Sequence, residues 1–200
     1  ALELKESGGG KVTILSVGGA DYEPIMRKAL AIGADEAIRV DSDTRDSFQI
    51  ASEIAAVAKS NAYDLILLGK ETIDYNGANV GGMIAGLMDY PYVSNASKLE
   101  VNSNVGQIER EKQGGTEVLE AKLPCVISCA KGMAEQRIPN MRGIMAARSK
   151  PLNVVASCGA GAMTEVVSFT LPDAKGSVKL IDPENAAELI NLLHTEAKVI

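Results

Sequence analysis

The residues of this chain best suited to bind a ligand lie between positions 64 and 86, DLILLGKETIDYNGANVGGMIAG. The apolar run 65–68 is typical of a buried strand that stops at Gly69, and after a short polar loop residues 76–86 run into a helix. The unpaired N–H groups of a first helical turn favour an anion, and glycines let a phosphate come close to the backbone. The spacing therefore predicts a phosphate-bearing ligand at a strand-to-helix junction, where open α/β sheets build nucleotide sites.

A second glycine-bearing loop, residues 16–20 (SVGGA), follows an earlier strand. In a parallel sheet the carboxyl ends of all strands lie on the same edge, so this loop is expected on the same edge as residues 69–76. The two loops together predict a cleft for an adenine nucleotide, although each alone could be only a turn. Asn76 is either the helix N-cap or a polar contact to the ligand. Asp74 would repel phosphate unless it faces a sugar hydroxyl or a backbone N–H. Met83 and Ile84 are better explained as core residues.

The chain offers no catalytic machinery and no metal site, so we assign neither catalytic nor metal-binding residues. It has one histidine, His194, no nucleophile elbow and no carboxylate cluster at metal spacing. Neither a GxGxxG fingerprint nor a P-loop motif is present. Cys125, Cys129 and Cys158 form no disulfide framework and indicate structural thiols in a reducing compartment. Binding or electron transfer is favoured over acid–base or nucleophilic catalysis.

The elements that must position the two loops alternate along the first half of the chain. We expect strands at 11–17, 36–40 and 65–68, with helices from Asp21 to Gly33 and from Asp46 or Ser47 to Lys59. The inward stripe of the second helix would be Ile50, Ile54, Val57 and Ala58. This order predicts an α/β fold with an open, mostly parallel sheet, helices on both faces and right-handed crossovers. Residues 1–6 read as the end of a helix that no strand precedes, so we expect a missing first strand.

The second half predicts a different organisation. Strands at 92–101, 105–111 and 116–122 suggest an antiparallel excursion at the sheet edge, followed by a buried strand at 125–128 and a short helix near 143–147. Residues 151–182 are rich in loops, and a last helix spans 184–194. We expect a nucleotide-binding domain at 1–150 and an extension at 151–200 that docks on another chain.

Composition limits the possible partners. The 200 residues carry a net charge of −6, with 46% hydrophobic and 23% charged residues and a pI near 4.9, which is ordinary for a soluble domain. An acidic chain argues against nucleic acid and acidic membranes as partners. No apolar run is long enough for a membrane span, and no signal peptide is visible, so we expect a soluble protein.

Residues 130–150, AKGMAEQRIPNMRGIMAARSK, are basic within this acidic chain. They are either a solvated loop with a short amphipathic helix or a docking loop in which flexible apolar side chains enter a partner's pocket and arginines steer an acidic partner. The apolar candidates include Met133, Ile138, Met141, Ile144 and Met145, and the cationic ones Lys131, Arg137, Arg142, Arg148 and Lys150.

Several motifs in this order, LLGKETID, NxxxxGGMIAG, LPCVIS and RIPNMRGIMAARSKPL, together with ALAIGAD at 29–35, resemble the small (beta) subunit of electron transfer flavoproteins. The resemblance runs from Leu4 to the last residues. It implies an adenine nucleotide α-hydrolase-like fold and a heterodimer with a large (alpha) subunit that carries redox-active FAD. This subunit would hold AMP, or a second FAD in electron-bifurcating members.

The resemblance also implies functional residues. The nucleotide contacts would be Ser16, Val17, Gly18, Asp74, Asn76, Gly77, Ala78, Asn79, Val80, Gly81, Gly82, Met83 and Ala85. The basic loop would anchor a partner dehydrogenase through Arg137, Ile138, Met141, Ile144 and Met145, with the family's leucine anchor falling on Met141. The proline-arginine-tyrosine usual in that loop is Gln136-Arg137-Ile138 here, which puts the choice of partner in doubt.

The implied function is that of an electron carrier subunit rather than an enzyme. Electrons would come from acyl-CoA dehydrogenases of fatty acid beta-oxidation and leave to a membrane quinone reductase, in bacterial cytoplasm or the mitochondrial matrix, with no insertion of this subunit into the membrane. Two alternatives stay open: a subunit of a bifurcating flavoenzyme with a second FAD, and a stand-alone nucleotide-binding stress-type protein. The missing first strand and its loop would leave the adenine side of the nucleotide site incomplete.

Overall fold

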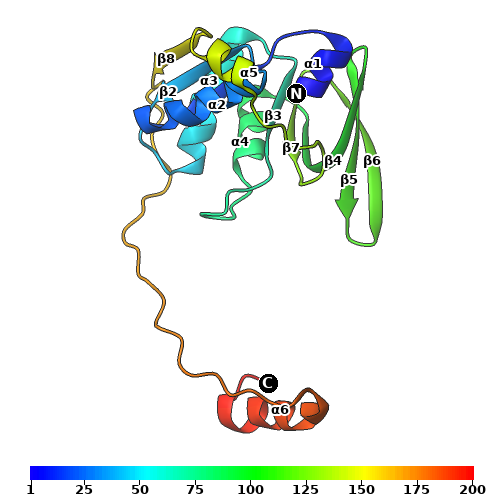
Figure 1. The fold of residues 1–200 in the computed structure, drawn as a ribbon, viewed down its shortest axis with the longest axis vertical. Coiled ribbons are helices and arrows are strands. Elements are labelled where there is room, and N and C mark those ends of the chain that lie inside the picture. Colours follow the sequence, from blue (N-terminus) through cyan, green and yellow to red (C-terminus); the bar gives the residue numbers. More distant parts are fainter. The chain divides into compact units, whose positions relative to one another are not determined.

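A computed structural model describes residues 1–200, and its first half alternates strands and helices as the hydrophobic pattern predicts. The elements are α1 (Leu2–Gly8), β1 (Thr13–Val17), α2 (Glu23–Ile32), β2 (Glu36–Asp41), α3 (Ser47–Asn61), β3 (Leu65–Gly69) and α4 (Val80–Met88) (Figure 1). A 3-10 turn, Ala20–Tyr22, precedes α2, so Asp21 lies within this turn and does not cap the helix as expected. Asp46 does cap α3, because its side chain accepts a hydrogen bond from the Gln49 N–H.

The second half carries the expected hairpins and one strand that the sequence pattern did not reveal. Its elements are β4 (Tyr92–Asn102), β5 (Val105–Lys112), β6 (Gly115–Lys122), β7 (Cys125–Cys129), α5 (Met141–Ala147) and β8 (Leu152–Ala156). The unexpected strand is β8, which pairs in parallel with β2, Ala37 lying opposite Leu152. The segment after residue 150 therefore begins as part of a sheet.

The strands form two hydrogen-bonded sheets, in the orders β1-β2-β8 and β3-β7-β4-β5-β6. The pairs β1·β2, β2·β8, β3·β7 and β4·β7 are parallel, and only β4·β5 and β5·β6 are antiparallel. The predicted α/β fold, open and mostly parallel with an antiparallel excursion, is confirmed. No hydrogen-bonded pairing joins β1 to β3, so the strands belong to two separate sheets.

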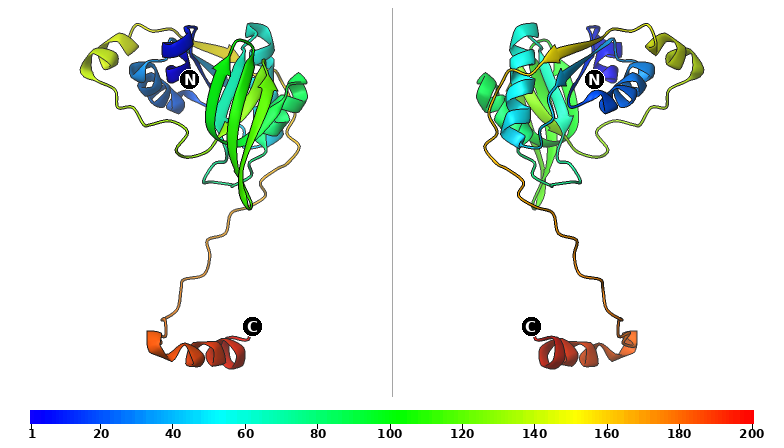
Figure 2. Two further views of the ribbon diagram at one scale, coloured as in Figure 1. Left: turned by 90° about the vertical axis from the view of Figure 1, so that its right-hand side faces the viewer. Right: turned by 90° about the vertical axis from the view of Figure 1, so that its left-hand side faces the viewer.

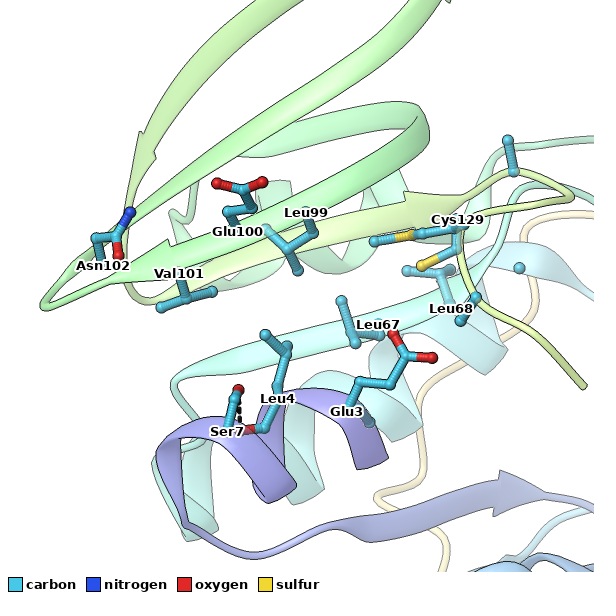
Figure 3. Close-up of a pocket in the computed structure, with 15 residues that line it drawn as sticks. Glu3, Leu4, Ser7, Leu67, Leu68, Leu99, Glu100, Val101, Asn102 and Cys129 are labelled. Carbon is cyan, nitrogen blue, oxygen red and sulfur yellow. Dashed lines mark hydrogen bonds between the residues drawn. The ribbon is translucent and has the colours of Figure 1, made fainter. Parts of the chain in front are cut away.

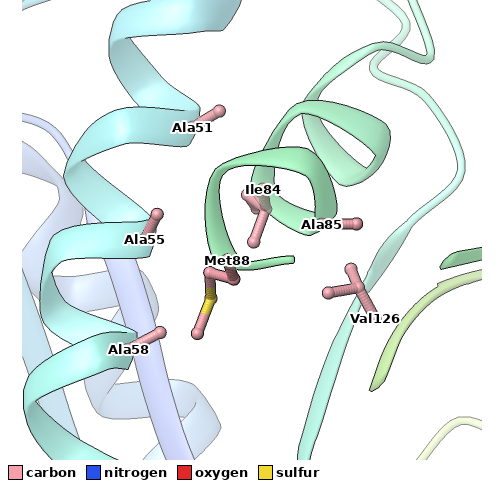
Figure 4. Packing of buried hydrophobic residues seen from close by; sticks show 7 residues of the cluster. All are labelled: Ala51, Ala55, Ala58, Ile84, Ala85, Met88 and Val126. Atoms are coloured by element: carbon pink, nitrogen blue, oxygen red, sulfur yellow. The ribbon is translucent and has the colours of Figure 1, made fainter. Parts of the chain in front are cut away.

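The core of the five-stranded sheet follows the period-two alternation of β3. Ile66 and Leu68 face a cluster formed by α3 and α4, whereas Leu65 and Leu67 face the other side. In Figure 4, Ala51, Ala55 and Ala58 of α3 point toward α4. The expected stripe is confirmed at Ala58, which is buried in this cluster, and at Ile54, which packs against it. Ala51 and Ala55 take the places expected for Ile50 and Val57, which are not part of the cluster.

The chain divides into two compact units, residues Ala1–Glu165 and residues Val166–Ile200. The second unit contains a 3-10 turn (Pro183–Asn185), α6 (Ala186–Leu192) and a π-helical turn (Leu193–Ala197). Asp182 caps this helical segment by accepting a hydrogen bond from the Glu184 N–H at 3.0 Å, and the expected last helix is confirmed. No helix of the chain combines the length and the apolar character needed to cross a lipid bilayer.

Candidate functional site

The connection from β3 to α4 is an exposed loop, residues 69–79, organised by Thr72. The Asn76 N–H donates to the Thr72 carbonyl at 2.8 Å, and the Asp74 N–H donates to the Thr72 hydroxyl oxygen at 3.1 Å. The Asp74 carboxylate in turn accepts a hydrogen bond from that hydroxyl at 3.2 Å. These contacts hold Asp74 within its own turn.

The N-terminus of α4 has no side-chain cap. The helix begins at Val80, and Asn76, with a φ of +49°, is not its N-cap; that alternative was wrong. Asn79 occupies the cap position but its side chain makes no capping hydrogen bond. The first backbone donor to be used is Met83, whose N–H reaches the Asn79 carbonyl at 3.0 Å. The N–H groups of the three preceding residues, 80–82, have no partner within the protein, which is the arrangement that accepts an anion.

The glycines in and just before α4 differ in how much space surrounds them. A Cβ on Gly81 would lie 2.8 Å from the ring of Tyr92, so its absence is explained by core packing. Gly77 and Gly82 have room for a Cβ at ordinary contact distances. Ala85 is buried in the core between α3 and α4, and Met83 packs against that core. The backbone with room for a ligand therefore lies in the exposed residues 77–79 and at Gly82.

The loop after β1 is held by a buried arginine that the sequence reading did not single out. Arg39, only 5% exposed, donates to the Gly18 carbonyl at 2.8 Å and to the Asp41 carboxylate at 2.5 Å. The Gly18 N–H donates to the Val40 carbonyl at 3.0 Å. In the sequence, Arg39 stands out only as a charged residue in the middle of a short apolar strand.

The two predicted nucleotide loops lie at the carboxyl ends of β1 and β3, as expected from their strands. Ser16 and Val17 end β1, and Gly18 follows directly. Because β1 and β3 belong to different sheets, no strand pairing brings the loops together, and no hydrogen bond connects residues 16–18 to residues 74–85. A shared cleft stays a prediction.

A hollow of about 790 Å³ lies elsewhere, between α1 and the five-stranded sheet. Figure 3 shows Leu4 of α1 directed at Leu67, with Leu99 nearby on β4. The charged side chains in its lining are the carboxylates Glu3 and Glu100, so the hollow is not suited to a phosphate.

The two thiols of β7, Cys125 and Cys129, are not activated. Cys129 borders this hollow, and burial raises its pKa; burial does the same for Cys125. A raised pKa keeps a cysteine protonated and unreactive. All three cysteines are free thiols, and no group of three or more histidine, cysteine or acidic residues is arranged to hold a metal ion.

The basic loop presents apolar side chains to solvent. Ile138 is 85% exposed, Met141 74% and Met145 63%, while Ile144 is 41% exposed. The short helix α5 that carries three of them is capped by Asn140, whose side chain accepts a hydrogen bond from the Gly143 N–H at 2.8 Å. We refer to these four exposed apolar side chains, Ile138, Met141, Ile144 and Met145, as the docking patch.

Arg137 is already paired. Its guanidinium donates two hydrogen bonds to the Glu6 carboxylate of α1, at 2.6 and 2.8 Å, and this contact lowers the pKa of Glu6. This ion pair joins the basic loop to α1. Arg142 and Arg148, by contrast, are exposed and make no ion pair.

A further set of contacts ties residues 157–164 to α3. The buried carboxylate of Glu53 accepts hydrogen bonds from the Ser157 hydroxyl and, at 2.7 Å, from the Cys158 N–H. Burial alone would raise the pKa of Glu53, but these hydrogen bonds outweigh it and lower the pKa. Asp46 accepts from the Thr164 hydroxyl and N–H at 2.5 and 2.9 Å, which lowers its pKa to about 2.

Comparisons with known proteins agree with the motifs. A family model described as the electron transfer flavoprotein domain matches residues 1–173. The electron transfer flavoprotein subunit beta of Bacillus subtilis is 34% identical, over 100% of this chain and 83% of that protein. The subunit of the same name from Syntrophomonas wolfei is 35% identical over 92% and 74%. The caffeyl-CoA reductase-Etf complex subunit CarD of Acetobacterium woodii is 29% identical over 99% and 81%.

Proposed function

The chain belongs to the beta-subunit family of electron transfer flavoproteins, and from this we propose that it serves as the small subunit of a heterodimeric electron carrier. In this proposal the large subunit holds the FAD that carries the electrons. The chain described here supplies a nucleotide site and a docking surface for acyl-CoA-type dehydrogenases, and the carrier delivers electrons to a quinone reductase. The protein would work in the bacterial cytoplasm or the mitochondrial matrix.

The observation that carries the docking role is the docking patch on α5. Its four apolar side chains are exposed in a basic segment of the chain, and exposed apolar patches mark interaction sites. Methionine side chains adapt to the shape of a partner's pocket. Met141 is the most exposed large apolar side chain on α5 and is our proposed anchor.

AMP is the proposed ligand of the nucleotide site. The uncapped start of α4 supports this assignment, because three backbone N–H groups there are unpaired and the neighbouring backbone is open. When bound, the nucleotide would add a negative charge that complements the helix dipole. Val80 and Gly82 would present backbone N–H groups to the phosphate. Asp74 would face a sugar hydroxyl rather than the phosphate.

The C-terminal unit is the proposed contact to the large subunit. Its helix α6 exposes Leu189 and Ile190, and Val199 and Ile200 are also exposed. Apolar side chains on so small a unit are stabilised when another chain covers them.

A second candidate function is supported by the similarity to CarD, which is named as a subunit of a reductase complex. A bifurcating flavoenzyme subunit would hold a second FAD at the β3–α4 loop in place of AMP. The same loop geometry would serve the phosphates of either ligand.

One experiment separates these functions. The full-length protein is co-expressed and purified with its large subunit, and flavin and AMP are counted per heterodimer. One FAD and one AMP support the carrier, and two FAD with no AMP select the bifurcating subunit. Failure to isolate a heterodimer would refute both.

A further inference from the structure

Helices α2 and α5 are fastened to each other by two basic side chains that cap each other's helix. The Lys150 ammonium donates to the Leu30 and Ala34 carbonyls at the end of α2, at 2.9 and 2.5 Å. The Arg27 guanidinium of α2 donates to the Ala147 and Lys150 carbonyls at the end of α5, at 2.8 and 2.7 Å. Cations at helix C-termini are stabilising, so this reciprocal contact fixes α5 on α2.

A hollow of about 620 Å³ lies between these two fastened helices. Its apolar walls are Pro24, Ala31, Pro139, Ile144 and Ala147. Figure 2 shows α5 beside α2, at the end of the long loop that leaves β7. Because the helices are held by the reciprocal caps, the hollow exists before any partner arrives, which lowers the entropy that binding would cost.

The charges around the hollow have one sign. Its remaining lining residues are Arg27, Lys28 and Arg148, and none of the eight is acidic. Lys28 and Arg148 are exposed and make no ion pair in the structure. In a chain with a net charge of −6, a cationic rim with no acidic residue in its lining provides charge complementarity to an anionic group.

The hollow is continuous with the docking patch through Ile144. This side chain lines the hollow and also belongs to the patch on α5. A partner that covers Met141 and Met145 would therefore reach the hollow with a neighbouring segment. Its apolar walls suit an aliphatic side chain, and its rim suits a carboxylate beside it.

We propose that this hollow receives a glutamate or aspartate, with an adjacent aliphatic residue, from the surface of the docking dehydrogenase. The inference rests on the proposed docking function and adds to it the chemistry of the partner segment. The carboxylate pairs with Arg148 and Lys28, and the aliphatic side chain packs between Ile144 and Pro139. Met141 supplies a separate apolar anchor.

The test uses the assembled heterodimer with isotope-labelled methyl groups and two peptide probes. The probes are acetyl-Leu-Glu-Glu-Leu-amide and its glutamine analogue, acetyl-Leu-Gln-Gln-Leu-amide. We expect the glutamate peptide to shift the Ile144, Ala31 and Ala147 methyl signals and to bind about tenfold more tightly than the analogue. The double variant Lys28→Gln/Arg148→Gln should remove this preference. Its charge-matched control is Lys59→Gln/Lys122→Gln, which changes two exposed lysines outside the hollow and should keep it.

Three outcomes would overturn the proposal: no methyl shifts, equal binding of the two peptides, or tighter binding of hexanoate at the same methyl groups. The last would make the hollow a site for small carboxylates. Peptide binding needs no dehydrogenase, so it is independent of the docking function itself. A second measurement is electron transfer from a purified acyl-CoA dehydrogenase to the heterodimer. The Lys28→Gln/Arg148→Gln variant should raise the KM of the dehydrogenase for the heterodimer about tenfold and leave the rate at saturation unchanged.

Discussion

Gly143 of α5 lies against the carbonyl oxygen of Ala31 in α2 so closely that a Cβ at Gly143 would stand 2.2 Å from that oxygen. No side chain can replace the glycine without moving one helix. The reciprocal contacts of Arg27 and Lys150 join the same two helices, so the position of α5, and with it the docking patch, depends on the absence of a side chain at Gly143.

Gly143→Ala should therefore displace α5 and destabilise the domain by roughly 1–3 kcal/mol, the usual range for overpacking. The matched control is Gly86→Ala in α4, where a Cβ meets nothing within 4 Å. That change should stabilise the helix by up to about 1 kcal/mol. Chemical denaturation of both variants measures the difference. If Gly143→Ala and Gly86→Ala had the same free energy of unfolding, moving α5 away from α2 would not destabilise the domain.

Met141→Ala should weaken docking and leave assembly intact. Met141 is 74% exposed and caps no helix, so its truncation removes apolar contact area at the partner and nothing within the domain. We expect the KM of the dehydrogenase for the heterodimer to rise about tenfold, since an anchor residue contributes more than about 1 kcal/mol to the binding free energy. The control is Met163→Ala, an equally exposed methionine (73%) outside the patch. Unchanged transfer kinetics would remove the anchor role from Met141.

Neighbouring glycines of α4 should respond in opposite ways to alanine. A Cβ at Gly81 would enter the space of the Tyr92 ring, whereas the nearest atom to a Cβ at Gly82 lies at 3.7 Å. Gly81→Ala should lower the free energy of unfolding by roughly 1–3 kcal/mol, and Gly82→Ala should not lower it. Thermal unfolding of the two variants decides the matter. If Gly82→Ala were the more damaging change, the assignment of Gly81 to core packing would be wrong.

Local chemistry predicted most of the fold, and the exceptions have physical reasons. Asp46 is one of the two caps that the sequence predicts for α3, because capping depends on the next three residues, but its bond to Thr164 spans 118 positions. Strand β8 cannot be predicted from a local pattern, because it is short and largely exposed and is stabilised by pairing with β2. The start of α4 was placed too early, since Asn76 and Ala78 adopt left-handed conformations that delay the helix to Val80. The reason for Gly81 lies in Tyr92, which no local pattern reveals.

The attachment of residues 157–164 to α3 should weaken in acid. Hydrogen bonds, the largest from Thr164, lower the pKa of Asp46 from its ordinary value of 3.8 to about 2. A carboxylate with a lowered pKa stabilises the fold above its unfolded pKa and loses that contribution as the pH falls through its folded pKa. The stabilisation should therefore be complete above about pH 4 and disappear toward pH 2.

Asp46→Asn tests this dependence. The difference in thermal unfolding midpoint between the wild type and Asp46→Asn should be present at pH 7 and shrink as the pH falls from 4 toward 2. The exposed Asp43, changed to asparagine, is the control and should show no such gap. A gap that is independent of pH would mean that the ionised form of Asp46 is not what holds Thr164.

Asn79→Asp should empty the nucleotide site without harming the helix. Asn79 stands at the cap position of α4, where its amide makes no capping bond and residues 80–82 keep free N–H groups. A carboxylate there would interact favourably with the helix dipole, stabilising α4 by about 0.3–1 kcal/mol, and would repel a bound phosphate. We expect AMP affinity of the heterodimer to fall about tenfold or more while its unfolding midpoint without nucleotide stays the same or rises. Asn153→Asp on the exposed part of β8 adds the same charge elsewhere and should leave AMP bound. If Asn79→Asp also retained AMP, the phosphate would not lie at the start of α4.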